Sequence, residues 1–278
     1  MRFLFALLLA IPLLAGAQDN QSYIREELGK LAWQRGPTEG AVAGKATIKV
    51  PARYVFLDEQ NTRRFLELNG NPPQDGHYMF GPENLSWFVI FSFNPMGYVK
   101  DDEKIDPDAL LSQLKESDEP SNEERRRLGM SALYTEGWQV APHYDVETKR
   151  LEWGIRVRDD ANNMQVNYTS RLLGRSGVMN AVLVSDPESL DMDIREFKSS
   201  LQKFSYNAGE SYAEFRDGDK IAEYGLAALV LGGAAAVATK KGLWAVIGGF
   251  FAAFWKVLVG LAVAAVASIG SLFKKKKE

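Results

Sequence analysis

The sequence contains no cysteine in its 278 residues. Disulfide bonds, thiol chemistry and a cysteine-linked lipid anchor are therefore excluded. Histidine is almost as rare, because His77, which we predict to lie in a loop, and His143 are the only two. The chain also has no Walker loop, no dinucleotide fingerprint, no H-E-x-x-H and no G-x-S-x-G sequence. These absences disfavour the common nucleotide-dependent, zinc-dependent and serine-hydrolase classes.

Positive charge is scarce between residues 18 and 223. The chain has 33 basic and 36 acidic residues, of which Arg2, the seven lysines from Lys240 onward and Glu278 lie outside this segment. Residues 18–223 thus carry a net charge of about −10, whereas residues 224–278 carry about +6. Nucleic-acid binding depends on neutralisation of phosphates by lysine and arginine. We therefore predict no nucleic-acid partner.

The first 17 residues have the composition of a secretory signal. One positive charge, Arg2, precedes the apolar run Phe3–Leu14, and Ala15-Gly16-Ala17 supplies the small residues of a cleavage site. The apolar run is too short to span a bilayer, which needs about 20 apolar residues. We predict that residues 1–17 are a signal peptide cleaved after Ala17 and that residues 18–223 form one exported domain.

The longest apolar stretch is Tyr224–Phe273, and four lysines follow it. Its cleanest candidate for a span is Val257–Phe273, because a membrane helix needs about 20 apolar residues. The positive-inside rule then places the terminal lysines in the cytoplasm, so the number of crossings is odd, either one with an interfacial or hairpin segment or three short ones. We expect residues 224–278 to anchor the domain on the periplasmic side of the inner membrane, with the lipid bilayer as its partner.

The middle of the chain has the pattern of an antiparallel meander. Four runs with strand composition are separated by segments rich in turn-forming residues; they are Trp138–Tyr144, Lys149–Arg158, Met164–Leu172 and Gly177–Val184. Ala46–Val50, Tyr54–Leu57 and Trp87–Phe93 are further predicted strands, the last buried on both faces. Gly36–Gly44 is predicted to be a connector rich in glycine and proline.

Helix-start signals lie between these strands. Asp58 is predicted to cap a helix that ends at Leu68, and Asp106-Pro107 and Asp186-Pro187 each place proline just inside a helix. The helix after Asp186 has an apolar stripe from Leu190 to Phe204. Ser121 and Glu124 match a capping box, and the following Arg125–Arg127 is expected to be a solvated face. An antiparallel sheet with packed helices means an α+β fold, followed by a C-terminal transmembrane helical anchor.

Five groups of residues are similar to a known family. They are Gly97–Glu103, Pro142–Asp145 with Arg150–Trp153, Val166–Tyr168, Arg171–Met179 and Tyr212–Lys220. Together they resemble a family of predicted membrane-anchored bacterial proteins, domain of unknown function 2167. The resemblance runs from about Trp33 to the start of the apolar segment. It implies a location at a membrane and no established reaction, so no catalytic residue follows from it.

The second strand of the meander supplies the candidate site. Leu151, Trp153, Ile155 and Val157 alternate along it with Arg150, Glu152, Gly154 and Arg156, so one face is predicted to be core and the other polar. If Tyr144 pairs with Lys149, His143 lies opposite Arg150 and diagonal to Glu152. The predicted polar face then carries His143, Asp145, Arg150, Glu152 and Arg156.

This set of side chains has two interpretations. A histidine beside carboxylates could act as a general base or hold a metal weakly. An ordinary solvated sheet face with cross-strand ion pairs explains the same residues. A second acidic group, at residues 101–108, lacks the spacing and the glycine of an EF-hand. We predict no catalytic residue, no cofactor and no metal.

Three functional classes remain open. The first is a non-enzymatic envelope protein whose domain binds another envelope protein or forms a homo-oligomer, and the absence of a catalytic motif favours it. The second is an accessory subunit of an envelope transport or secretion system that acts through the anchor. The third is a hydrolase that uses the His143 face.

Overall fold

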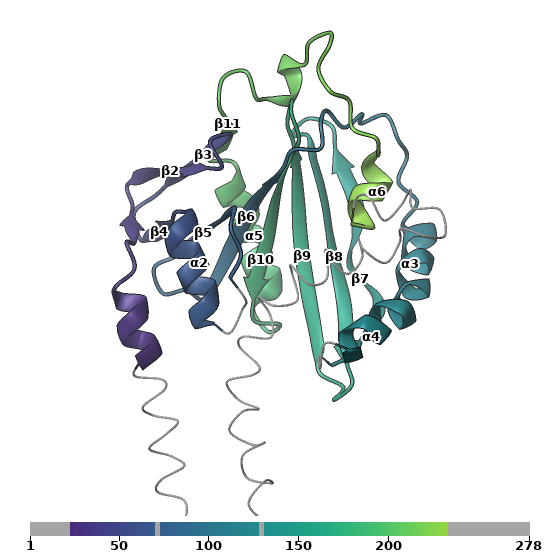
Figure 1. Ribbon diagram of the computed structural model, residues 1–278, viewed down its shortest axis with the longest axis horizontal. Coiled ribbons are helices and arrows are strands. Elements are labelled where there is room, and N and C mark those ends of the chain that lie inside the picture. Colours follow the sequence, from purple (N-terminus) through teal and green to yellow (C-terminus); the bar gives the residue numbers. More distant parts are fainter. Residues whose placement is uncertain (1–22, 70–72, 128–130, 233–278) are drawn as a thin grey trace, which may run out of the picture.

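The computed structural model describes residues 23–69, 73–127 and 131–232 (Figure 1). Within them, eight strands form an antiparallel sheet in the order β1-β4-β5-β6-β10-β9-β8-β7. Its strands are β1 (Gln34–Arg35), β4 (Tyr54–Leu57), β5 (His77–Pro82), β6 (Trp87–Asn94), β7 (Leu133–Asp145), β8 (Arg150–Asp159), β9 (Met164–Leu173) and β10 (Val178–Ser185).

A second sheet has three strands in the order β11-β3-β2, again antiparallel. They are β2 (Thr38–Val42), β3 (Ala46–Val50) and β11 (Phe204–Tyr206). The helices are one over residues 23–29, then α2 (Glu59–Leu68), α3 (Pro107–Glu116), α4 (Asp118–Arg127), α5 (Leu190–Leu201), the 3₁₀ helix η1 (Tyr212–Glu214) and α6 (Leu226–Val230). The predicted α+β fold with a large antiparallel sheet is thus confirmed.

Both faces of the large sheet are covered. On one face, the apolar stripe of α5 and the inner side of the small sheet pack on β6, β10 and β9, with Trp87, Phe91 and Tyr168 at the centre. On the other face, α2 packs on β4 to β6 through Phe65 and Leu66. Farther along that face, α3 and α6 cover Leu151 and Trp153 of β8, together with neighbouring residues. Figure 1 shows these helices around the sheet.

The meander is confirmed, because β7, β8, β9 and β10 are consecutive neighbours in the sheet. β3 and β4 have the predicted bounds. Two predictions about the first half of the chain are wrong. The expected connector at 36–44 contains β2, which pairs with β3, and His77, expected in a loop, begins β5. β2 forms a hairpin with β3, and β5 pairs with β4 and β6, so these strands are stabilised by neighbouring strands rather than by their own composition.

Two of the predicted helix starts are confirmed. The side chain of Asp58 accepts a hydrogen bond from the N–H of Asn61 at 2.9 Å, and Asp106 caps α3 with Pro107 at its start. The third is wrong, because α5 begins at Leu190 rather than at Pro187. Residues 186–189 instead form a turn in which the N–H of Ser189 donates to the Asp186 carbonyl at 3.1 Å.

The expected capping box at Ser121 is also wrong. Ser121 lies inside α4, and its hydroxyl donates to the Ser117 carbonyl at 2.7 Å. Nor is the arginine run wholly solvated. Arg125 is buried, and its Nε donates to the Ser131 carbonyl at 2.7 Å. α4 starts directly after α3, so its first residue and its orientation are set by α3 rather than by a cap of its own. This orientation turns Arg125 towards the sheet.

The predicted anchor lies largely outside the described residues, as does the predicted signal peptide. In the part that is described, α6 (Leu226–Val230) packs into the core beside Val99, Leu151 and Trp153. Among residues 23–69, 73–127 and 131–232, no helix has the length and apolar character that a membrane crossing requires.

Candidate functional site

The β7–β8 pairing differs from the predicted register. Tyr144 pairs with Leu151 rather than with Lys149, so His143 stands directly opposite Glu152 and Asp145 opposite Arg150. The connecting loop contains residues 146–149, where Lys149 has a left-handed φ of 54°. Asp145 holds the loop by accepting hydrogen bonds from the N–H groups of Glu147 and Thr148 at 2.9 and 3.2 Å. The loop has the predicted length but lies one residue farther along the chain.

The predicted polar face is only partly solvated, because His143, Asp145 and Arg156 are exposed whereas Glu152 is buried. Glu152 is only 5% exposed, because α5 lies over this side of the sheet. Lys198 of α5 makes an ion pair with Glu152 at 2.6 Å, and Arg150 donates to the Leu201 carbonyl at 3.4 Å. Arg156, farther along the strand, is exposed. The alternation of apolar and polar side chains along β8 was predicted correctly. Alternation cannot show, however, that helices cover both the apolar and the polar face of the strand.

Glu152 is the centre of a compact polar cluster. Besides Lys198, it faces His143 at 3.4 Å and accepts hydrogen bonds from Tyr168 and Ser170, both at 3.3 Å. Burial by itself raises the pKa of Glu152, but the hydrogen bonds and charges of His143 and Lys198 outweigh it and hold that pKa at about 2. A carboxylate with so low a pKa is a poor proton acceptor at neutral pH. The cluster therefore serves best to fasten α5 to β8.

His143 makes the stability of this contact depend on pH. The hydrogen bond to Glu152 raises the pKa of His143. The folded pKa exceeds the unfolded value of about 6.5, so the gain is complete below about pH 6.5 and is lost as the pH rises through the folded pKa. His143→Ala should lower the melting temperature at pH 5.5 and hardly change it at pH 9. Because the side chain is 47% exposed, the loss should stay below about 1 kcal/mol.

His77 provides the control for this prediction. Burial lowers the pKa of His77, so protonation of His77 opposes folding. Its effect on stability therefore depends on pH in the opposite direction to that of His143. His77→Ala should be relatively more stable at pH 5.5 than at pH 9. An equal effect of His143→Ala at both pH values would show that the Glu152 contact does not depend on protonation.

A second candidate site lies at the end of the sheet where β6 ends and β10 begins. Three of the five residue groups that resemble the family meet there, although they are far apart in the chain. The N–H of Gly97 donates to the Ser176 carbonyl at 3.2 Å, that of Tyr98 to the Lys220 carbonyl at 2.8 Å, and that of Arg175 to the Glu210 carbonyl at 2.8 Å. Figure 1 shows the segment between β11 and α6 beyond the ends of the strands. We call this region the motif end.

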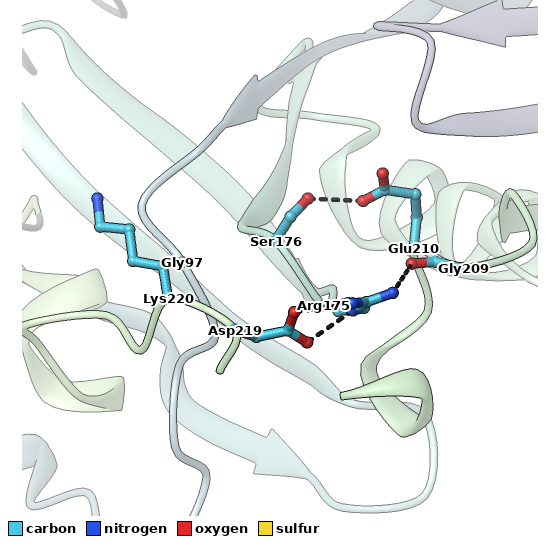
Figure 2. A pocket seen from close by; sticks show the side chains of 7 residues that line it. All are labelled: Gly97, Arg175, Ser176, Gly209, Glu210, Asp219 and Lys220. Atoms are coloured by element: carbon cyan, nitrogen blue, oxygen red, sulfur yellow. Dashed lines mark hydrogen bonds and ion pairs between the residues drawn. The ribbon is translucent and has the colours of Figure 1, made fainter. Parts of the chain in front are cut away.

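A cavity of about 290 Å³ opens at the motif end (Figure 2). Two charged pairs form its walls. Arg175 makes a two-point contact with the Asp219 carboxylate, at 2.7 Å for each bond, and also donates to the Gly209 carbonyl. Glu210 accepts hydrogen bonds from Ser176 and Lys45, both at 2.6 Å. The walls are therefore held together by bonds between segments that are distant in sequence.

The pKa values of the Asp219 and Glu210 carboxylates indicate that their charges stabilise the structure. The hydrogen bond from Arg175 lowers the pKa of Asp219 to about 2. Burial alone raises the pKa of Glu210, and the bonds from Lys45 and Ser176 lower it further than burial raises it. Both groups are thus ionised and paired at neutral pH, a state that suits a rigid surface better than proton transfer.

Aromatic rings stabilise the same end of the sheet. Tyr98 stacks on Tyr212 and lies against Phe215, with ring centroids 4.3 Å apart in both pairs. Asp101, which belongs to the acidic group at residues 101–108, accepts hydrogen bonds from Tyr144 at 2.8 Å and Lys149 at 2.9 Å. Within the described residues, no group of three or more histidine, aspartate or glutamate side chains is placed to hold a metal ion.

Some exposed residues of the motif end form no part of this internal network. Lys220 is exposed, and its side chain points away from the Arg175–Asp219 pair in Figure 2. Ile221 follows it and is 46% exposed, which makes it one of the few large apolar side chains at the surface. Sequence reasoning missed Lys198, Glu210 and Ile221, because no local pattern marks them. The resemblance did include Arg175, Asp219 and Lys220, but gave no reason to group them.

Comparison with protein families now gives a clear result. The chain matches the family described as "Protein of unknown function (DUF2167)" over residues 34–265. It belongs to this family. The match to DUF2167 includes the motif end and the His143–Glu152 cluster. No curated protein matches the chain in sequence.

The solved structures that match include the solution structure of cyanobacterial PsbP (CyanoP) from Synechocystis sp. PCC 6803. The match has a TM-score of 0.36 and 9% sequence identity, and covers 63% of this DUF2167 chain and 92% of CyanoP. So distant a likeness says nothing about activity.

Proposed function

We propose that this DUF2167 protein is an exported, membrane-anchored bacterial envelope protein that binds a second envelope protein, or a second copy of itself, through the motif end. The observation that carries the proposal is the meeting of three family-like residue groups around one cavity, with exposed Lys220 and Ile221 beside it. Rigid surfaces with a central apolar side chain and a charged surround are typical of protein interfaces.

The cellular location rests on the ends of the sequence. The apolar run with Ala15-Gly16-Ala17 supports export, and the apolar segment from Tyr224 with its terminal lysines supports an anchor. We propose that the domain faces the periplasm at the inner membrane and that the lysine tail lies in the cytoplasm. An acidic domain is repelled by anionic lipid, so its surface is free for a protein partner rather than adsorbed on the bilayer.

Site-specific photo-crosslinking in intact cells tests the proposal. A photoreactive amino acid at Ile221 of the full-length protein should give a discrete adduct, whereas the same group at Met164, which is 44% exposed at the end of β9 opposite to the motif end, should give none. Lys220→Glu should abolish the adduct without a change in melting temperature, since an exposed charge adds little stability. Lys203→Glu, at an exposed site outside the motif end, is the matched control.

The composition of the adduct distinguishes the partners. Twice the mass of the chain means self-association, and another mass identifies a different envelope protein, including a subunit of a transport or secretion system. Mass spectrometry of the same adduct should show Gln18 as the first residue. An adduct at Met164 as strong as at Ile221, or none at either, would remove the motif end as the binding surface, and an intact Met1 would contradict cleavage after Ala17.

A further inference from the structure

Two adjoining cavities lie at the opposite end of β6 from the motif end. The larger, of about 690 Å³, is lined mostly by polar residues of the loops before β4 and after β5, and by Glu196 of α5. The smaller, of about 210 Å³, is lined mainly by Leu28, Trp33, Val55 and Leu85. Arg35 and Glu83 line both cavities and form an ion pair at 2.9 Å. We call the two cavities together the β1 groove, because Arg35 belongs to β1.

The backbone of the β1 groove is strained at one position in each cavity. Arg53 in the larger cavity has a φ of 67°, and Leu85 in the smaller has a φ of 52°. This left-handed conformation is unfavourable for a residue with a Cβ atom and is taken routinely by glycine. Hydrogen bonds hold both turns, since the N–H of Glu83 donates to the Arg53 carbonyl at 2.9 Å and that of Leu85 to the Pro82 carbonyl at 2.9 Å. Glycine would remove this strain at Arg53, whose side chain is exposed, whereas the Leu85 side chain also packs against the core beside α2.

The guanidinium of Arg53 is a positive charge of the groove that no described residue neutralises in an ion pair. Within the described part of the chain, Arg53 makes no ion pair, whereas the neighbouring Arg35 is bound to Glu83. The Glu196 carboxylate is already engaged, because it accepts hydrogen bonds from the Tyr54 hydroxyl and from Trp87 Nε1. Burial, and after it the bond to Glu196, raises the pKa of Tyr54 to about 12, so Tyr54 remains a donor to Glu196. Arg53 is therefore free to bind a carboxylate from outside.

We infer that the β1 groove binds an extended peptide segment of another protein, with an apolar side chain in the Leu85 cavity and a carboxylate at Arg53. Side chains two residues apart point to the same side of an extended chain, about 6.8 Å apart, so the predicted pattern is apolar-x-acidic. The Arg35–Glu83 pair lies between the two cavities. It offers a donor and an acceptor to a peptide amide, but it would interrupt the apolar tail of a lipid.

The cavity sizes agree with this occupant. Small-molecule sites usually measure about 300–1,000 Å³ and are mostly apolar. The apolar cavity of the β1 groove is smaller than that range and suits a single side chain. The larger cavity is polar and has the charge of Arg53 at its edge. Because the groove and the motif end lie at opposite ends of β6, the inference does not depend on the function proposed above.

Arg53→Gly separates binding from folding. Glycine accepts the left-handed backbone without strain, so this variant should melt at the same temperature as the native protein or higher. A library of random twelve-residue peptides displayed on phage should be selected on the full-length protein in detergent micelles. The expected result is a set of enriched peptides that share the apolar-x-acidic pattern. Their affinity should fall about tenfold or more on Arg53→Gly, the loss typical of a charge-assisted contact.

Two controls fix the interpretation. Asn162→Gly changes another left-handed residue, at the exposed β8–β9 turn, and should leave peptide affinity unchanged. Replacing the acidic residue of the peptide by its amide should weaken binding to native protein but not to Arg53→Gly. Peptides that bind both proteins equally, or an enriched pattern without an acidic residue, would overturn the inference. Failure to enrich any peptide, with self-association that Arg53→Gly abolishes, would assign the groove to a second copy instead.

Discussion

Trp153→Ala should lower the free energy of unfolding by about 3–5 kcal/mol, the usual cost of deleting a buried large aromatic side chain. Trp153 is 3% exposed and lies in the cluster where α3 and α6 pack on β8. The guanidinium of Arg171 lies over its ring at 5.6 Å, which adds a cation–π contact to the lost packing. Removal of the ring leaves a cavity in the cluster between the sheet and the two helices, and such cavities are only partly filled by relaxation of the surroundings.

Denaturant unfolding of the full-length protein, followed by circular dichroism, measures this effect. Val146→Ala, at a side chain 62% exposed in the β7–β8 loop, should change the free energy of unfolding by no more than about 0.5 kcal/mol. A loss below about 1 kcal/mol for Trp153→Ala would mean that the Trp153 side of β8 is not a core face, and would contradict the arrangement of α3 and α6.

The second large effect is expected at Gly177, within the motif end. A Cβ atom at Gly177 would lie 2.1 Å from the Asn94 carbonyl oxygen and 2.8 Å from the Phe93 ring. A clash with backbone cannot be relieved by a change of rotamer, so β6 and the β9–β10 turn would have to separate. Gly177→Ala should therefore cost about 3 kcal/mol, at the upper limit of typical overpacking, and should abolish the Ile221 adduct together with the fold of the motif end.

Gly137→Ala is the matched control in the same sheet. Its nearest contact would be the end of the flexible Arg156 side chain at 3.3 Å, which can move aside. The change should therefore alter the free energy of unfolding by about 0.5 kcal/mol or less. If both variants proved equally stable, β6 would not approach the β9–β10 turn as closely as the structure shows.

The two predictions concern different kinds of contact in the same region. Trp153 tests whether the core face of β8 was assigned correctly, and Gly177 tests how tightly the family-like residue groups are packed together. A stable Gly177→Ala protein that still loses the Ile221 adduct would separate the shape of the motif end from the stability of the domain. Such a result would strengthen the interpretation of the motif end as a binding surface.

The candidate site around Glu152 could be predicted only in part from the sequence. The alternation along β8 correctly predicted that Leu151 and Trp153 face a core. It also placed His143 near Glu152, although the shifted register sets them directly opposite each other. It predicted a polar face, but it could not predict that α5 buries Glu152 of that face beneath Lys198. A period of two distinguishes the faces of a strand, but it contains no information about which helix covers each face.

The sequence by itself determined the local features of this protein. The absence of cysteine, the bounds of β3 and β4, the meander, and the caps of α2 and α3 all depend on residues within a few positions of one another. Only the tertiary structure decided the strand order that sets β6 beside β10 and so brings Gly97, Ser176 and Glu210 together. The same holds for Arg53 and Leu85, whose strained turns meet at one groove. The physical reason is that capping and alternation are local interactions, whereas strand order follows from burying the apolar surface of the whole chain at once.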